Sequence, residues 1–261
     1  GDGVFETVLV REGRAILLER HLARLASSAR GLGLQAPDPD EVRTAARQVL
    51  ASEELALGRL RITYTAGPGP LGSGRRAGQR SLIVLAESAD PPAPSTRVAV
   101  VPWPRNERGA LAGLKTTSYA ENARALAWAV EQGADEAIFA NTAGNLCEGT
   151  GSNVFVVLGE DGGEDGGEDG GAGAEGQVIT PPLSSGCLAG VTRAIAVQCG
   201  ALERDLAVDD FKAEHLVEAF LTSTARGVQP IATIDGAELR ECPGPATRRI
   251  AEQLEKLRAE E

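Results

Sequence analysis

The chain has 261 residues, with 26 Lys and Arg against 37 Asp and Glu, a net charge of −11, 42% hydrophobic and 24% charged residues. These values are typical of a folded chain with enough apolar residues for a core, and they exclude disorder along the whole length. The excess of acid disfavours nucleic acid and anionic membranes as partners, and no apolar run approaches the ~20 residues that span a bilayer. We therefore expect a soluble, cytoplasmic protein.

The start of the chain and its cysteines give two further expectations. No Met occurs, and residues 1–3 lead directly into a strand-like run at 4–10, so we expect the chain to lack its true N-terminus. The cysteines are scattered and only two His occur, so the spacing of a zinc site is absent. We expect reduced thiols and no metal. The four cysteines are Cys147, Cys187, Cys199 and Cys242.

The first half of the chain alternates strand and helix patterns. The expected elements are a hairpin of 4–10 and 15–18, helices at 19–31 and 39–55, and strands at 59–64, 81–86 and 97–101. Asp38 is the expected N-cap of the second helix. Residues 67–72 have the spacing G-x-G-x-x-G, but a strand follows rather than a helix. We therefore interpret them as a loop and not as a dinucleotide site.

The second half begins with a capping box, Ser118-x-x-Glu121, that predicts a helix ended by Gly133. The further elements are strands at 136–140, 145–148, 153–158, 177–180 and 217–222, and helices at 190–199 and 245–259. Residues 159–176 are rich in Gly, carry seven acidic residues and predict a loop at a hairpin tip; they lack the ligand order of a calcium loop. The mixed order indicates an α+β fold in two lobes, 1–110 and 111–261.

Several short stretches hold residue types suited to chemistry. Lys115 comes directly before the capped helix, and Glu148 ends a strand ahead of a turn of small residues. Residues 190–193 open a helix, whose free N–H groups suit a phosphate. Hydroxyl groups follow the strand that ends near Thr222. Each feature alone also fits an ordinary surface lysine, a solvated acid or a helix cap.

Taken in order, these stretches resemble the class IV, or fold type IV, pyridoxal-phosphate enzymes. The matching stretches are GDGVFET (1–7), ERHLARL (19–25), LAGLKTTSYAEN (111–122), CEGTGSNVFVV (147–157), CLAGVTR (187–193) and FLTSTARGVQPI (220–231). The resemblance implies pyridoxal 5'-phosphate as cofactor and a two-lobed fold like that of D-amino-acid aminotransferase. It also implies a homodimer, and a strand segment before residue 1.

The resemblance assigns a role to each matching residue. Lys115 would attach the cofactor and move the substrate proton, Glu148 would pair with the pyridine nitrogen, and Arg24 would clamp the phosphate with a bidentate fork. The phosphate cup would be completed by Val191, Thr192, Ser223 and Thr224. Leu188 would pack against the ring, and the substrate cleft would include Phe5, Tyr119 and Asn153.

The subfamily is less determined. The loop after 61–65 has no His, which weakens a D-amino-acid transaminase, and RLRITYT lacks the Tyr-x-Arg-Pro strand of branched-chain enzymes. Arg105-Asn106 and 111–115 resemble the aminodeoxychorismate lyases, although those often depart from GDGVFET at the position of Glu6. We expect a 4-amino-4-deoxychorismate lyase that releases pyruvate and 4-aminobenzoate in folate biosynthesis. The alternatives are an aminotransferase for branched-chain or D-amino acids and a non-catalytic cofactor-binding protein.

Overall fold

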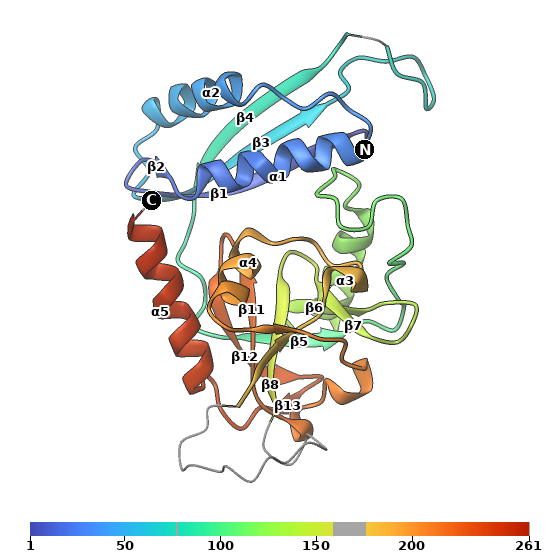
Figure 1. Ribbon diagram of the computed structural model, residues 1–261, viewed down its shortest axis with the longest axis vertical. Helices are drawn as coiled ribbons and strands as arrows, with labels where there is room; N and C mark the ends of the chain where they lie inside the picture. Colours follow the sequence, from blue (N-terminus) through green and yellow to red (C-terminus); the bar gives the residue numbers. More distant parts are fainter. Residues whose placement is uncertain (77, 159–175, 261) are drawn as a thin grey trace. The chain divides into compact units, whose positions relative to one another are not determined.

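The computed structural model describes residues 1–76, 78–158 and 176–260, which form two compact units of mixed helix and strand (Figure 1). Unit 1 comprises Gly1–Pro91 and Leu114–Tyr119, and unit 2 comprises Pro92–Gly113 and Ala120–Glu260. The expected α+β class is confirmed. The unit boundary differs from the expected junction at 110/111, because residues 92–113 include a strand of the unit 2 sheet, whereas 114–119 bond back to the first strand of unit 1.

Unit 1 is a four-stranded antiparallel sheet in the order β2-β1-β3-β4, with two helices packed on one face. Its elements are β1 (Gly3–Arg11), β2 (Arg14–Ala15), α1 (Leu18–Gly31), α2 (Pro39–Ala51), β3 (Leu57–Thr65) and β4 (Ser81–Ser88). Side chains alternate along β3, so that Leu60, Ile62 and Tyr64 enter the core while Arg59 and Arg61 face away. The expected helices and strands are present, except that the second strand of the hairpin is Arg14–Ala15 rather than 15–18, because α1 already begins at Leu18.

The N-cap of α2 agrees with the sequence, whereas its end does not. Asp38 Oδ1 accepts a hydrogen bond of 2.9 Å from Asp40 N, and Pro39 is the first helical residue. The helix ends at Ala51, before the expected Leu55, because Ser52 N already bonds back to Val49 O. Leu55 instead packs into the core of unit 1.

Unit 2 is a nine-stranded mixed sheet in the order β10-β9-β8-β11-β12-β5-β6-β7, with β13 beside β12. Its strands are β5 (Thr96–Val100), β6 (Glu136–Ala140), β7 (Leu146–Gly149), β8 (Asn153–Leu158), β9 (Val178–Thr180), β10 (Leu202–Glu203), β11 (Leu216–Ser223), β12 (Gly227–Ile234) and β13 (Ala237–Glu238). Its helices are α3 (Ala120–Glu131), α4 (Val191–Gln198) and α5 (Pro245–Glu260), with short 3-10 turns at Leu183–Ser185, Val208–Asp210 and Ala213–His215. The sequence did not predict β10, β12 or β13.

The sheet of unit 2 is buried on both faces. Along β8, Val154 and Val156 belong to one apolar cluster, while Phe155 and Val157 belong to another that includes residues of α4 and α5. Phe155 stacks on Phe220 of β11 with ring centroids 4.9 Å apart. This double burial explains why 153–158 is a continuous apolar run.

The expected capping box at 118–121 is replaced by other bonds. Ser118 Oγ donates to Gly1 O at 3.2 Å, while Glu121 Oε2 accepts from Arg105 Nε at 3.2 Å. The helix that follows, α3, starts at Ala120. Local sequence therefore predicted the helix, but its first residues bond to distant segments rather than to each other.

The other expectations concern loops, thiols, membrane spans and metal sites. Residues 67–72 lie in the loop from β3 to β4, as expected, and all four cysteines are free. The interpretation of 159–176 as a hairpin tip lies, except for Gly176, outside the described residues, although β8 and β9 pair antiparallel on either side of it. No helix within the described ranges is long and apolar enough to cross a bilayer. Those ranges also hold no group of three or more His, Cys, Asp or Glu arranged to hold a metal.

Candidate active-site residues in the two units

In unit 1, Lys115 is held by backbone bonds to β1 and α1. Phe5 N donates to Lys115 O at 3.0 Å, and Lys115 N donates to Ser28 Oγ at 3.2 Å. The next residue, Thr116, forms a bridge to Val4. The segment that carries Lys115 is thus fixed against two elements although it follows a long excursion of the chain through unit 2.

The side chain of Lys115 lies among aromatic rings. Its Nζ is 4.5 Å from the centroid of the Phe5 ring and 5.8 Å from that of Tyr119, and these two rings meet edge to face at 5.1 Å. The sequence-predicted residues Phe5, Tyr119 and Lys115 are therefore neighbours. A cation in such surroundings is stabilised by the ring faces and has less water around it than at an open surface.

Beside Lys115, the sequence missed an arginine. Arg61 of β3 places its guanidinium carbon 3.4 Å above the centroid of Phe5. Burial lowers the pKa of Arg61, while the charges of Tyr119 and Glu6 oppose this shift. The alternation of side chains along β3 predicts that Arg61 points away from the core. It does not predict the contact with Phe5, which depends on the β1–β3 register that pairs Phe5 with Thr63.

Beneath these rings, β1 and α1 meet at a buried carboxylate. Glu6, fully buried, accepts bonds from Arg24 Nε at 2.8 Å, Arg24 Nη2 at 2.7 Å and His21 Nδ1 at 2.7 Å. Burial raises the pKa of Glu6, but the hydrogen bonds and charge of Arg24, with a smaller contribution from His21, outweigh it and lower the pKa to about 2.

The same cluster limits what Arg24 and His21 can do. Burial lowers the pKa of His21 in spite of Glu6, with the charges of Arg24 and Lys115 acting in the same direction as burial, so the imidazole is neutral and donates through Nδ1. The bidentate edge of Arg24, which the sequence assigned to a phosphate, is taken by Glu6. A phosphate contact by Arg24 would have to use another side of the guanidinium.

In unit 2, the acid next to the end of β7 is held by an arginine and a backbone amide. Glu148 Oε1 accepts from Arg105 Nη1 at 2.5 Å, and Glu148 Oε2 accepts from Leu188 N at 2.9 Å. Arg105 also donates from Nη2 to Asn122 Oδ1 at 3.0 Å and lies 3.9 Å above the ring of Phe139. Glu148 is thus an oriented, part-buried carboxylate rather than a solvated acid.

Asn153, the first residue of β8, connects Glu148 to the start of α4. Its Nδ2 donates to Leu188 O at 2.9 Å, so Leu188 is held through its amide by Glu148 and through its carbonyl by Asn153. A Cβ at Gly190 would overlap Asn153 Oδ1, so a residue without a side chain is needed there. In the register of β8 and β11, Asn153 lies opposite Thr222.

These contacts gather hydrogen-bond donors suited to a phosphate. Helix α4 begins at Val191, with Thr192 buried in its first turn and no side-chain cap from Gly190. Thr222 Oγ1 is buried without a hydrogen-bond partner among the described residues. Ser223 Oγ accepts from Arg226 N at 3.1 Å, which leaves the hydroxyl proton to donate, and Thr224 follows it. Uncapped helix amides and an orphaned hydroxyl fit an oxyanion.

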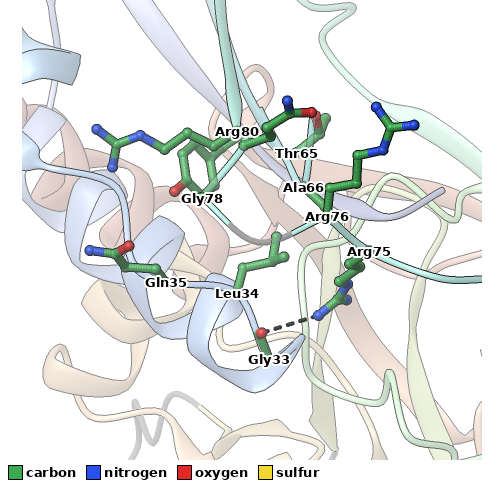
Figure 2. A pocket seen from close by; sticks show the side chains of 11 residues that line it. Gly33, Leu34, Gln35, Thr65, Ala66, Arg75, Arg76, Gly78 and Arg80 are labelled. Carbon is green, nitrogen blue, oxygen red and sulfur yellow. Dashed lines mark hydrogen bonds between the residues drawn. The ribbon is translucent and has the colours of Figure 1, made fainter. Parts of the chain in front are cut away.

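A separate cavity of about 660 Å³ lies in unit 1, beside the end of α1 and the loop from β3 to β4 (Figure 2). Arg75 Nη1 donates across it to Gly33 O at 3.1 Å. Its lining consists of Gly33, Leu34, Gln35, Tyr64, Thr65, Ala66, Arg75, Arg76, Gly78, Gln79 and Arg80. None of the residues that the sequence singled out for catalysis or cofactor binding lines this cavity.

Comparison with known proteins gives a consistent result. The family model for amino-transferase class IV matches residues 3–234. The bifunctional aminodeoxychorismate lyase / D-amino acid transaminase of Mycobacterium tuberculosis is 33% identical over 267 residues, which cover 93% of this chain and 85% of that protein.

Two solved structures are also similar. The branched-chain aminotransferase of Thermoproteus uzoniensis is 28% identical, with a TM-score of 0.82 over 99% of this chain and 86% of that one. A PLP-bound hypothetical aminotransferase from Mycobacterium tuberculosis is 28% identical, with a TM-score of 0.76 over 99% of this chain and 89% of that one.

Proposed function

Because the chain belongs to the class IV aminotransferase family of pyridoxal-phosphate enzymes, we propose that it is a 4-amino-4-deoxychorismate lyase, which releases pyruvate and leaves 4-aminobenzoate. The observation that carries the proposal is the arrangement of Lys115 beside Phe5 and Tyr119, in a chain whose Mycobacterium relative is named for this activity. A lysine among aromatic rings can attach an aldehyde and then serve as a base.

The residues present fit the cofactor. In unit 1, Lys115 would bond to it covalently, and Arg24 would add positive charge for the phosphate. In unit 2, Glu148 would hold the pyridine nitrogen protonated, Leu188 would pack on the ring, and Val191, Thr192, Ser223 and Thr224 would donate to the phosphate. Bound pyridoxal phosphate supplies an electron sink for the carbon next to the substrate amine.

In the proposed reaction, Lys115 accepts the proton from the substrate carbon that bears the amine. The carbon–oxygen bond to the enolpyruvyl group then breaks, enolpyruvate leaves and takes up a proton to become pyruvate, and the ring becomes aromatic. Tyr119 and Phe5 would shape the substrate cleft, with Asn153 supporting it through Leu188. Arg61 would bind an anionic group of the substrate, since its guanidinium lies over the same ring as Lys115.

The test offers the cofactor-loaded protein enzymatically generated aminodeoxychorismate and follows 4-aminobenzoate by fluorescence. Product formation that is lost in Lys115→Ala, together with loss of the visible absorbance of the lysine-bound cofactor, is the expected result. Cofactor binding without 4-aminobenzoate would contradict the lyase. Retained absorbance in Lys115→Ala would contradict the assignment of Lys115.

A second candidate is an aminotransferase for D-amino acids, which passes the amine to a 2-oxo acid. The Mycobacterium relative carries both activities in its name, and this chain retains Glu6 in GDGVFET. Both reactions use the same lysine and the same acid at the pyridine nitrogen, so the site does not separate them. A screen of D- and L-amino donors with 2-oxoglutarate, followed by keto-acid release, distinguishes the two.

We also propose that the protein is a homodimer. The basis is the resemblance of the ordered motifs to class IV enzymes, which implies a homodimer. Light scattering at micromolar concentration gives the mass directly, and a mass near the 27.1 kDa of a single chain would contradict the proposal.

A further inference from the structure

A second buried carboxylate in unit 2 has no role in the reaction proposed above. Glu136, the first residue of β6, is fully buried. Its Oε1 accepts from Ala137 N and Thr150 N, each at 3.0 Å, and from Thr150 Oγ1. Its Oε2 accepts from Ser152 Oγ at 3.3 Å and pairs with Arg226 Nη2 at 3.1 Å. A buried charge persists only when it is compensated in this way.

One side of this cluster fixes the turn between β7 and β8. That turn, residues 149–152, separates Glu148 from Asn153, and Glu136 binds the amide and the hydroxyl of Thr150 together with the hydroxyl of Ser152. Asn122 Nδ2 donates to Thr150 O from the other side and accepts from Arg105, which itself binds Glu148. Glu136 therefore holds the turn from one side, and Asn122 links it from the other side to Arg105, which orients Glu148.

The other side of the cluster reaches the turn between β11 and β12. Arg226 lies in that turn; its Nη2 pairs with Glu136, while its backbone N donates to Ser223 Oγ. Its Nη1 also donates to Gln229 Oε1 at 3.4 Å. The position of Arg226 thus sets the acceptor side of the Ser223 hydroxyl, and with it the direction in which the hydroxyl can donate.

We propose that the Glu136–Arg226 ion pair is a positioning device for the cofactor phosphate: it holds the 223–226 turn against the 149–152 turn so that Ser223 and Thr224 donate to the phosphate. This inference rests on the cofactor assignment of the proposed function. Neither residue touches the cofactor in this scheme. The pair acts through Ser223, so its loss weakens binding of the phosphate group and leaves the contacts to the pyridine ring.

The experiment compares two ligands that differ only in the phosphate. Dissociation constants of the apoprotein for pyridoxal 5'-phosphate and for pyridoxal are measured for the wild type, Glu136→Gln, Arg226→Gln and Arg226→Lys. We expect the preference for the phosphorylated ligand to fall about tenfold in Glu136→Gln and Arg226→Gln, the effect of losing one charge-assisted hydrogen bond. Arg226→Lys should retain most of the preference, because it keeps the cation.

A matched control is available in the same unit. Glu218 of β11 is equally buried and accepts from Ala246 N, Thr247 N and Thr247 Oγ1, at the start of α5. Glu218→Gln removes a buried carboxylate of the same kind, whose hydrogen bonds to the described residues go to the start of α5 and to neither turn. It should lower the melting temperature and leave the ratio of the two dissociation constants unchanged.

The outcomes separate the inference from the proposed function. If the wild type prefers pyridoxal phosphate but the ratio of the two dissociation constants is unchanged in both Arg226→Gln and Glu136→Gln, the positioning role is wrong. The cofactor assignment is then unaffected. An equal fall in Glu218→Gln also overturns the positioning role. A wild type that binds pyridoxal as tightly as pyridoxal phosphate overturns the phosphate cup and this inference together. If Glu136→Gln does not fold, Arg226→Gln decides alone, since its side chain is 27% exposed.

Discussion

Glu6 makes the stability of unit 1 depend on pH. Its pKa is lowered from 4.5 to about 2, so between these pH values Glu6 stays ionised in the folded state but is protonated in the unfolded chain. The stabilisation is fully present above pH 4.5, amounts to roughly 3 kcal/mol, and is lost as the pH falls toward 2. We expect urea unfolding to show that Glu6→Gln is less stable at pH 7 and that the difference from wild type shrinks below pH 4.5.

The control for this prediction is an exposed ion pair in the same unit. Glu41 pairs with Arg80 at 3.0 Å, with side chains 46% and 41% exposed. Such pairs contribute less than about 1 kcal/mol, so Glu41→Gln should change the urea midpoint little at either pH. A difference between Glu6→Gln and wild type that stays constant from pH 7 to pH 3 would show that Glu6 does not act through its charge.

Arg61 tests whether the cation above Phe5 binds substrate. Replacing it with Gln removes a guanidinium but keeps a polar side chain, so we expect KM for aminodeoxychorismate to rise about tenfold or more while cofactor affinity is retained. Arg59 lies two residues earlier on the same face of β3 and provides the matched control, Arg59→Gln. Steady-state kinetics of both variants decide the point, and equal KM values for the two would contradict a substrate role for Arg61.

At the scale of elements, the start of α4 depends on one small residue. A Cβ at Gly190 would overlap Asn153 Oδ1 and come within 3.0 Å of Arg193 Cβ, so the helix and β8 cannot keep their spacing if a methyl group is added. We expect Gly190→Ala to cost about 1–3 kcal/mol of stability and to weaken cofactor binding, because the uncapped amides of α4 move. Thermal unfolding and cofactor titration measure both effects.

Gly151 provides the comparison for Gly190→Ala. Its added Cβ would meet nothing within 4 Å, and its φ is not in the left-handed region. Gly151→Ala should therefore stay within about 0.5 kcal/mol of wild type in thermal unfolding. A loss in Gly151→Ala as large as that in Gly190→Ala would mean that the effect comes from backbone flexibility rather than from the overlap with Asn153.

The elements that the sequence predicted are those with local signals. The N-cap at Asp38, the alternation in β3 and the apolar run of β8 each depend on neighbouring residues, and each is present. Strand β12 forms a local hairpin with β11, but its sequence contains Pro230, which is unusual inside a strand, and its other partner, β5, lies more than 130 residues earlier. Nothing in the local pattern of 227–234 reports that pairing.

The same distinction applies to the site. The resemblance assigned Lys115, Phe5, Tyr119, Glu148, Leu188 and Asn153 to one site. The structure shows the first three as neighbours and links the other three by hydrogen bonds. Two charged contacts in unit 2 were missed, the one that orients Glu148 and the ion pair between the two turns, because each joins residues far apart in sequence. Arg105 meets Glu148 over 43 residues, and Arg226 meets Glu136 over 90 residues. The sequence around a single charged residue does not predict which distant residue it will pair with.

At the scale of the whole molecule, the acidic stretch can be tested for independence from the site. Residues 159–175 contain seven acidic residues, and their removal changes the net charge from −11 to −4. The strands on either side pair as a hairpin, with Val157 opposite Val178, so a short turn can close it.

We expect a variant with a two-residue Asn-Gly turn in place of 159–175 to keep its melting temperature, its cofactor affinity and its activity at 0.1 M salt. At this ionic strength the Debye length is about 10 Å, so salt weakens the contribution of the net charge to activity. A fall in activity in this variant would contradict the prediction. If a Gly/Ser linker of the original length restores the activity, the length of the segment matters to the site. If only an acidic linker restores it, the charge of the segment matters.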